Sequence, residues 1–332
     1  MKKKLIILAG IMAIMILVVF ATAYYNNRNY KRVSNNEEKS ISVVASFYPT
    51  YVLAINLTDG ISDIEVDGLT DFSGGCLHDY QLTANDMRLL SNADVFIING
   101  GGMEEYLANV IDSYPHLKII NLSEGITMLE SQVHHGGDNP HVWLDPHLYM
   151  LQIENAREGL VNYIQERVNV NKDNTNNESD YNKEVIEQLN SNADAYLEEV
   201  AALADDMNIM LDRVEDLVQN KNISNKVVVF HDSFAYLSNK AGLEVAYTIE
   251  IDEDTPLSAG EVAEVVDVIR QENILYLFTE EQYDDTISDR IMDETEAQVY
   301  VIDSAVTGDG TKDSYLKAMR RNIETLKKAF VE

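Results

Sequence analysis

The chain has 332 residues, of which 45% are hydrophobic and 24% charged, a balance that fits packed globular structure and excludes a wholly disordered chain. Its 56 acidic and 25 basic side chains give a formal net charge of −31, which argues against nucleic-acid binding. The single cysteine, Cys76, excludes an intramolecular disulfide and a cysteine-rich zinc site, so His, Asp or Glu would have to hold any metal.

The first 40 residues predict export. Residues 1–23 fit a signal peptide or a signal anchor, because three lysines precede an uncharged apolar run from Leu5 to Ala23. Cleavage after Ala23 and retention as a membrane helix both stay open, since the run approaches the roughly 20 residues that span a bilayer. No cysteine lies near residue 20, which argues against a lipid anchor. Residues 24–40 predict a tether, so we expect an extracytoplasmic protein, either anchored at the cell surface or secreted.

Short β-branched runs then alternate with helical patterns, which predicts two α/β lobes. Uninterrupted apolar runs such as 95–98 and 227–230 are typical of strands buried on both faces of a parallel sheet. The predicted strands are residues 41–47, 63–66, 94–98, 118–121, 226–230, 244–248, 274–278 and 299–302.

A long helical pattern separates the two sets of strands. Apolar residues recur at three- and four-residue steps from Val185 to Val214, which predicts a single helix long enough to join two lobes. A coiled-coil dimer is the alternative interpretation of this face. Residues 169–182, rich in Asn, predict an exposed loop before the helix. The predicted divisions are an N-terminal lobe at 41–182, a connecting helix at 183–220 and a C-terminal lobe at 221–332.

Three of the seven histidines, and one aspartate, lie in contexts that suit metal binding. His78 follows a glycine pair, His141 lies in an Asn-Pro-His segment, and His231 and Asp303 close apolar strands. Ligands of open α/β sheets gather at the carboxyl ends of strands, where His231 and Asp303 are expected. Three imidazoles and a carboxylate suit four-coordinate zinc and accept other divalent first-row metals. Any one of these residues alone is more often structural than functional.

The other candidates carry weaker signals. His134 and His135 predict part of a flexible loop, and His147 either supports a ligand or belongs to the polar surface. Cys76 is expected to be a small buried residue, although it lies two positions from His78. The glycines at 100–102 predict a tight strand-to-helix turn rather than a phosphate loop, because no Lys-Ser/Thr follows.

Six segments in this order resemble the zinc/manganese solute-binding proteins of metal ABC importers, the TroA-like or cluster A-I family. They are SFYP at 46–49, HDY at 78–80, LSNADVFIINGGGME at 90–104, NPHVWLDP at 139–146, FHDSFAYL at 230–237 and VID at 301–303. The resemblance implies two α/β lobes joined by one rigid helix, with a metal between the lobes held by His78, His141, His231 and Asp303. Cys76 and Leu77 depart from the small or proline-containing residues expected before the first ligand.

The resemblance also implies a function. It implies a monomeric binding protein, not an enzyme, that delivers Zn²⁺ to a membrane permease. Histidine at the third position is similar to zinc-type members, whereas manganese-type members tend to have glutamate there. Zinc is therefore expected, and manganese is the alternative metal. A secreted zinc hydrolase with Asp303 as its base, and a surface adhesin of the same fold, are the competing interpretations. The hydrolase is disfavoured because the chain lacks a His-Glu-x-x-His motif.

Overall fold

The computed structural model describes residues 40–70, 77, 80–107, 113–131, 137–170, 176–221, 224–249, 258–281 and 285–331. The predicted signal or anchor segment and nearly all of the tether lie outside these ranges. Across the ranges that the structure covers, no helix combines the length and the apolar character needed to cross a bilayer.

The first sheet has four strands in the order β2-β1-β3-β4, with β1 at Ile41–Ala45, β2 at Ile64–Gly68, β3 at Val95–Ile98 and β4 at Lys118–Asn121. β3 pairs in parallel with both β1 and β4. Val44 and Phe96 are buried on this sheet against Leu90 of helix α3 (Ala84–Asn92). Helices α2 (Tyr48–Leu57) and α5 (Pro146–Val170) also pack on the sheet.

The second sheet repeats this plan in the order β6-β5-β7-β8. Its strands are β5 at Lys226–Val229, β6 at Glu244–Thr248, β7 at Tyr276–Glu280 and β8 at Gln298–Ile302. β5 pairs in parallel with β6 and β7, and β7 pairs in parallel with β8. Apolar side chains of α8 (Ala259–Glu272) and α9 (Asp285–Glu294) form a core with β5 and β7. Helices α7 (Ala235–Lys240) and α10 (Ser314–Phe330) complete this lobe.

All eight predicted strands are present, and the boundary of β7 is the one that matters for function. The prediction placed this strand at 274–278, but it begins at Tyr276 and ends at Glu280. The reason is the helix before it: Asn273 closes α8 in the left-handed conformation at φ 52°, and the amide of Ile274 still donates to Ile269. The chain therefore joins the sheet two residues later, and its last strand residue is a glutamate.

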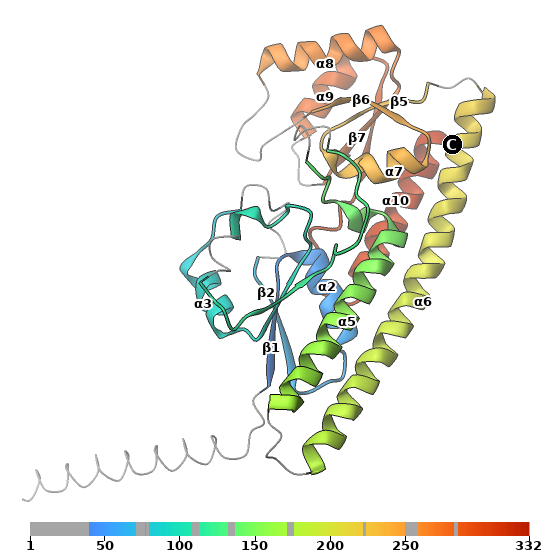
Figure 1. The fold of residues 1–332 in the computed structure, drawn as a ribbon. Helices are drawn as coiled ribbons and strands as arrows, with labels where there is room; N and C mark the ends of the chain where they lie inside the picture. Colours follow the sequence, from blue (N-terminus) through green and yellow to red (C-terminus); the bar gives the residue numbers. More distant parts are fainter. Residues whose placement is uncertain are drawn as a thin grey trace, which may run out of the picture. The chain divides into compact units, whose positions relative to one another are not determined.

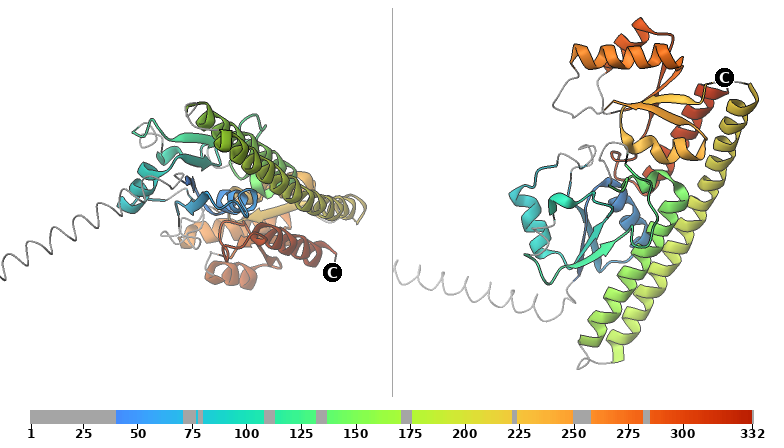
Figure 2. Two further views of the ribbon diagram at one scale, coloured as in Figure 1. Left: turned by 90° about the horizontal axis from the view of Figure 1, so that it is seen from below. Right: turned by 45° about the horizontal axis from the view of Figure 1, so that its top comes forward.

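Helix α6 (Asn176–Lys221) joins the two lobes (Figures 1 and 2). In its first half, the side-chain amide of Asn192 donates to the carbonyls of Leu57 and Asp59 in the first lobe. The helix also packs on α7 of the second lobe. The predicted apolar face is buried against α2, α5 and α10 of the same chain, so it is not left open for a coiled-coil partner. Its members are Val185, Leu189, Ala193, Tyr196, Val200, Leu203, Met207, Met210 and Val214.

The predicted loop at 169–182 is wrong at both ends. Helix α5 runs to Val170 and α6 begins at Asn176, so only residues 171–175 fall outside the helices, and these lie outside the described residues. The stretch from 176 to 184 contains neither Gly nor Pro. Extending an existing helix adds one hydrogen bond per residue without a new nucleation cost, which outweighs the weak helix preference of Asn.

The predicted glycine turn after β3 is confirmed. Gly100 and Gly101 have φ values of 83° and 65°, a region that side chains other than glycine rarely adopt. A Cβ on Gly100 would lie 2.1 Å from Oδ1 of Asn121. The buried carboxylate of Glu104 accepts hydrogen bonds from the amides of Asn99 and Gly100 at 2.8 and 3.0 Å and thereby fixes the turn.

Candidate metal site

His231 and Glu280 are brought together by the register of two parallel strands. Val229 of β5 pairs with Phe278 of β7, so the residues two positions further, His231 and Glu280, meet at the carboxyl edge of the sheet. The Nδ1 atom of His231 lies 3.2 Å from Oε1 of Glu280. This is the position at which open α/β sheets place their ligands.

Glu280 is a buried carboxylate, only 5% exposed, with several polar partners. Ser233 donates a short hydrogen bond to its Oε1 atom, and Ser304 also hydrogen-bonds to it. Burial alone would raise the pKa of Glu280, but the charge of His231 and the hydrogen bonds from His231, Ser233 and Ser304 outweigh burial and hold the pKa below its usual value. Glu280 is therefore a fixed negative charge behind the His231 ring.

His141 is held in a similar way by an amide. It is 2% exposed, and both its backbone N–H and its Nδ1 atom contact Oδ1 of Asn139, at 3.0 and 2.9 Å. Because an amide oxygen only accepts, Nδ1 carries the proton, and Nε2 is the nitrogen suited to bind a metal. Asn99 donates to the carbonyl of Pro140 at 2.9 Å, which ties this segment to the glycine turn after β3.

The two histidines, one from each lobe, meet edge to face. Their ring centroids are 4.7 Å apart with an interplanar angle of 85°. The ring of Trp143 lies 5.2 Å from that of His141, and its indole N–H donates to the carbonyl of Ser304 at 2.8 Å. One buried and one partly exposed imidazole, each with its Nδ1 atom beside an oxygen acceptor, are a partial ligand set for a divalent first-row metal.

Hydrogen bonds between the lobes hold the two histidine segments against each other. The Asn139 side chain donates to the carbonyl of Asp232 at 3.0 Å, and the Tyr236 hydroxyl donates to the carbonyl of Asn139 at 2.7 Å. Ser131 donates to the carboxylate of Asp232 at 2.8 Å. Residues next to each histidine thus fix the distance between them.

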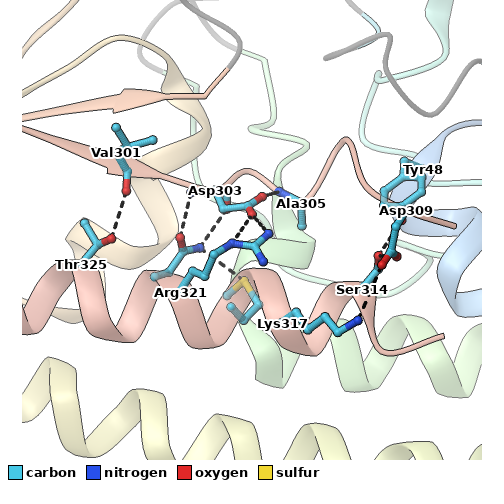
Figure 3. A network of polar contacts seen from close by, with 11 residues as sticks. Tyr48, Val301, Asp303, Ala305, Asp309, Ser314, Lys317, Arg321 and Thr325 are labelled. Carbon is cyan, nitrogen blue, oxygen red and sulfur yellow. Dashed lines mark hydrogen bonds and ion pairs between the residues drawn. The ribbon is translucent and has the colours of Figure 1, made fainter. Parts of the chain in front are cut away.

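Asp303 directly follows β8, the strand next to β7, and its carboxylate forms an ion pair with Arg321. It is 8% exposed, and its Oδ2 atom contacts Nε of Arg321 at 3.0 Å and also the Nη2 atom of that arginine (Figure 3). The next residue, Ser304, hydrogen-bonds to Glu280, so Asp303 is adjacent in sequence to a partner of the carboxylate beside His231. Among the described residues, no three His, Cys, Asp or Glu side chains are arranged as a metal cluster.

The remaining predicted candidates divide into two groups. His78, Cys76, His134 and His135 lie outside the described residues, although Leu77 beside His78 is described and buried. His147 is on the surface at the start of α5, where its Nε2 atom lies 2.8 Å from the amide nitrogen of Asn208 on α6. His147 therefore contacts the connecting helix rather than His141 or His231.

Glu280 and Asn139 are the site residues that the sequence interpretation missed as functional. The signal for Glu280 was present, because an acidic residue closing an apolar strand had already singled out Asp303. The signal marks Glu280 only when β7 ends at Glu280, as in the structure, and not when it ends at Phe278, as the sequence predicts.

Two parallel-sheet α/β lobes that share one long helix, with a histidine from each lobe meeting between them, define the class of two-lobed solute-binding proteins. The family model described as "Zinc-uptake complex component A periplasmic" matches residues 43–329. The chain belongs to this family, the ZnuA family, and the resemblance found in the sequence is confirmed.

Relatives with different metals in their names match most of the chain. The iron-binding protein YfeA of Yersinia pestis is 24% identical over 323 residues, which cover 96% of this chain and 95% of YfeA. The high-affinity zinc uptake system protein ZnuA of Bacillus subtilis is 24% identical over 320 residues, or 91% of each chain. The structure of the solute-binding protein FpvC from Pseudomonas aeruginosa with Mn²⁺ aligns with a TM-score of 0.68 at 21% identity, covering 88% of this chain and 98% of that one. The structural likeness confirms the predicted fold.

Proposed function

We propose that the protein is the extracytoplasmic solute-binding component of an ABC importer, which captures one divalent metal ion, zinc by preference, and delivers it to a membrane permease. The observation that carries this proposal is the meeting of His141 and His231, whose ring centroids are 4.7 Å apart while each Nδ1 atom faces an anchoring oxygen. Imidazoles oriented in this way are typical of metal sites.

The proposed ligands are His78, His141, His231 and Asp303. His141 and His231 would each bind through Nε2, because Nδ1 faces Asn139 in one ring and Glu280 in the other. His78 and Asp303 are included on the family resemblance, and they would complete the four-ligand set around the metal ion. Imidazole donors favour zinc over manganese, which prefers carboxylates, so manganese is the alternative cargo.

Carriage suits this site better than catalysis. A zinc hydrolase needs an open coordination position and a base beside it. The carboxylate that would be that base, Asp303, is paired with Arg321 and also accepts the amide of Ala305 at 2.8 Å. A carboxylate engaged at both oxygens is a poor general base, and we propose that the protein is not an enzyme.

We further propose that residues 1–23 direct the chain out of the cytoplasm and, where they are retained, anchor it to the membrane beside its permease. The working unit would be a monomer. Within it, the divisions at 41–182, 183–220 and 221–332 stay predictions.

Metal binding by the full chain tests the proposal. Protein purified without a tag or added metal should hold about one zinc ion, the count of a single mononuclear site. Competitive titration should favour zinc over manganese, and the fluorescence of Trp143, the chain's only tryptophan, should report binding because its ring lies 5.2 Å from His141. His231→Ala should abolish the response.

His147→Ala is the matched control, because His147 contacts Asn208 on the surface and should leave the metal content unchanged. A preference for manganese would keep the carrier and overturn the choice of zinc. Failure of the unmodified chain to bind either metal would overturn the proposal.

A further inference from the structure

Asp303 is held by two residues besides Arg321: Ala305 contacts its carboxylate, and Asn322 contacts its backbone. Its Oδ1 atom accepts the amide of Ala305 at 2.8 Å. The side chain of Asn322 accepts a hydrogen bond from the backbone N–H of Asp303 and donates one to its carbonyl, both at 2.8 Å. Asp303 therefore keeps its place without the guanidinium, and positioning is not what Arg321 is needed for.

Arg321 differs from Asp303 in exposure. Its side chain is 55% exposed on α10, whereas that of Asp303 is 9% exposed. Lys317, one turn earlier on the same helix, lies 2.9 Å from Asp313 and 3.6 Å from Asp309, so it is engaged by a separate acidic pair. Arg321 is thus the cation of α10 that faces the proposed ligand, and its charged end can move into water.

We propose that Arg321 is an affinity-setting residue that competes with the metal ion for Asp303. The inference rests on the proposed function. Without metal, the guanidinium neutralises a buried carboxylate that would be costly to leave unpaired. An arriving divalent ion takes over Oδ2 and displaces the guanidinium into solvent. This costs little on the arginine side, because the Arg321 side chain is already 55% exposed, and the ion replaces it as the partner of the buried carboxylate. When the metal leaves for the permease, Arg321 pairs with Asp303 again, so the buried carboxylate is not left without a counter-charge.

Two substitutions that remove the same charge from adjacent positions test this competition. Arg321→Gln should bind zinc about tenfold more tightly than the unmodified chain, because a positive charge next to the ligand is removed. We expect the gain mainly as slower release of zinc to a chelator. Arg320→Gln makes the same change in net charge at an exposed neighbour on α10 and should change the affinity by less than about twofold. In an Asp303→Asn background, Arg321→Gln should have no effect, because the contested carboxylate is gone.

The outcomes separate this inference from the proposed function. If the unmodified chain binds no metal, both fall together. If it binds zinc and Arg321→Gln matches Arg320→Gln or binds more weakly, only the competition is overturned. If thermal melting shows that Arg321→Gln is unfolded, Arg321→Lys replaces it. Its single amine cannot hold two nitrogens against Oδ2, so tighter binding than in the unmodified chain is expected, and unchanged binding overturns the inference.

Discussion

The Nδ1 atom of His231 lies 3.2 Å from Oε1 of Glu280, and this contact joins the ends of two neighbouring parallel strands. The strand register brings the two residues together, and Ser233 and Ser304 hold the carboxylate in place. A carboxylate behind a metal-binding imidazole fixes the tautomer and raises the basicity of the other ring nitrogen. Glu280 should therefore act on the metal through His231.

Replacing Glu280 with Gln should weaken zinc binding by about 10–100-fold, the usual effect of losing a carboxylate behind a ligand histidine. The amide keeps the shape of the side chain but loses the charge that faces His231. The measurement is competitive zinc titration followed by Trp143 fluorescence.

Glu281→Gln is the control for this prediction, because Glu281 is the exposed next residue and the change in net charge is the same. Equal affinities of the two variants would mean that Glu280 only packs against the ring. A larger loss than in His231→Ala would instead point to direct ligation by Glu280.

Asn139 supports His141 as Glu280 supports His231. Asn139→Ala removes the acceptor of two His141 contacts and the donor to Asp232, so it should weaken zinc binding about tenfold. It should also lower the free energy of unfolding by about 1–3 kcal/mol, because buried polar groups lose their partners. Zinc titration and chemical denaturation measure the two effects separately.

Asn155→Ala distinguishes lost stability from lost positioning. Asn155 donates to the carbonyls of Leu122 and Glu124, just after β4, at 2.7 and 3.0 Å, and not to the His141 segment. This variant should be destabilised yet keep its zinc affinity. A similar loss of affinity in both variants would show that zinc binding follows overall stability rather than the orientation of His141.

Much of the fold could be predicted because its signals are local. Buried parallel strands are runs of apolar β-branched residues, and the face of α6 repeats at helical spacing, so neither depends on knowing the partner segment. The boundary of β7 could not be predicted in this way. It depends on the left-handed turn at Asn273, and no periodic pattern marks that conformation.

The site was predictable only as a set of separate residues. His141 and His231 were singled out by their segments, and the structure brings their rings together. The ion pair between Asp303 and Arg321 was not foreseen, because the two residues are 18 positions apart on different elements and meet only when α10 packs beside β8. Long-range pairings of this kind depend on tertiary packing, which the spacing of residues along the sequence does not reveal.

The buried carboxyl of Glu104 makes stability depend on pH. Burial raises its pKa above the usual value, and hydrogen bonds from Ser46, Asn99 and Gly100 oppose the shift without cancelling it. Since the native state then holds this proton more tightly than the unfolded chain, the contribution of Glu104 to stability is fully present below its ordinary pKa of 4.5 and declines as pH rises through the native value.

Glu104→Gln should therefore destabilise the protein most in acid, by about 1–3 kcal/mol, and less as pH rises. The Gln amide has one oxygen, so it cannot accept hydrogen bonds from both Asn99 and Gly100, and this accounts for the lower stability in acid. At higher pH the Glu104 carboxyl must bury a negative charge and the amide does not, so the difference between the two proteins becomes smaller. Denaturation of both proteins from about pH 4 to about pH 8 measures the difference. Glu105→Gln, at the exposed next position, should show no such trend. A destabilisation that grows with pH would mean that the Glu104 carboxylate is favoured in the folded state and that its native pKa is lowered.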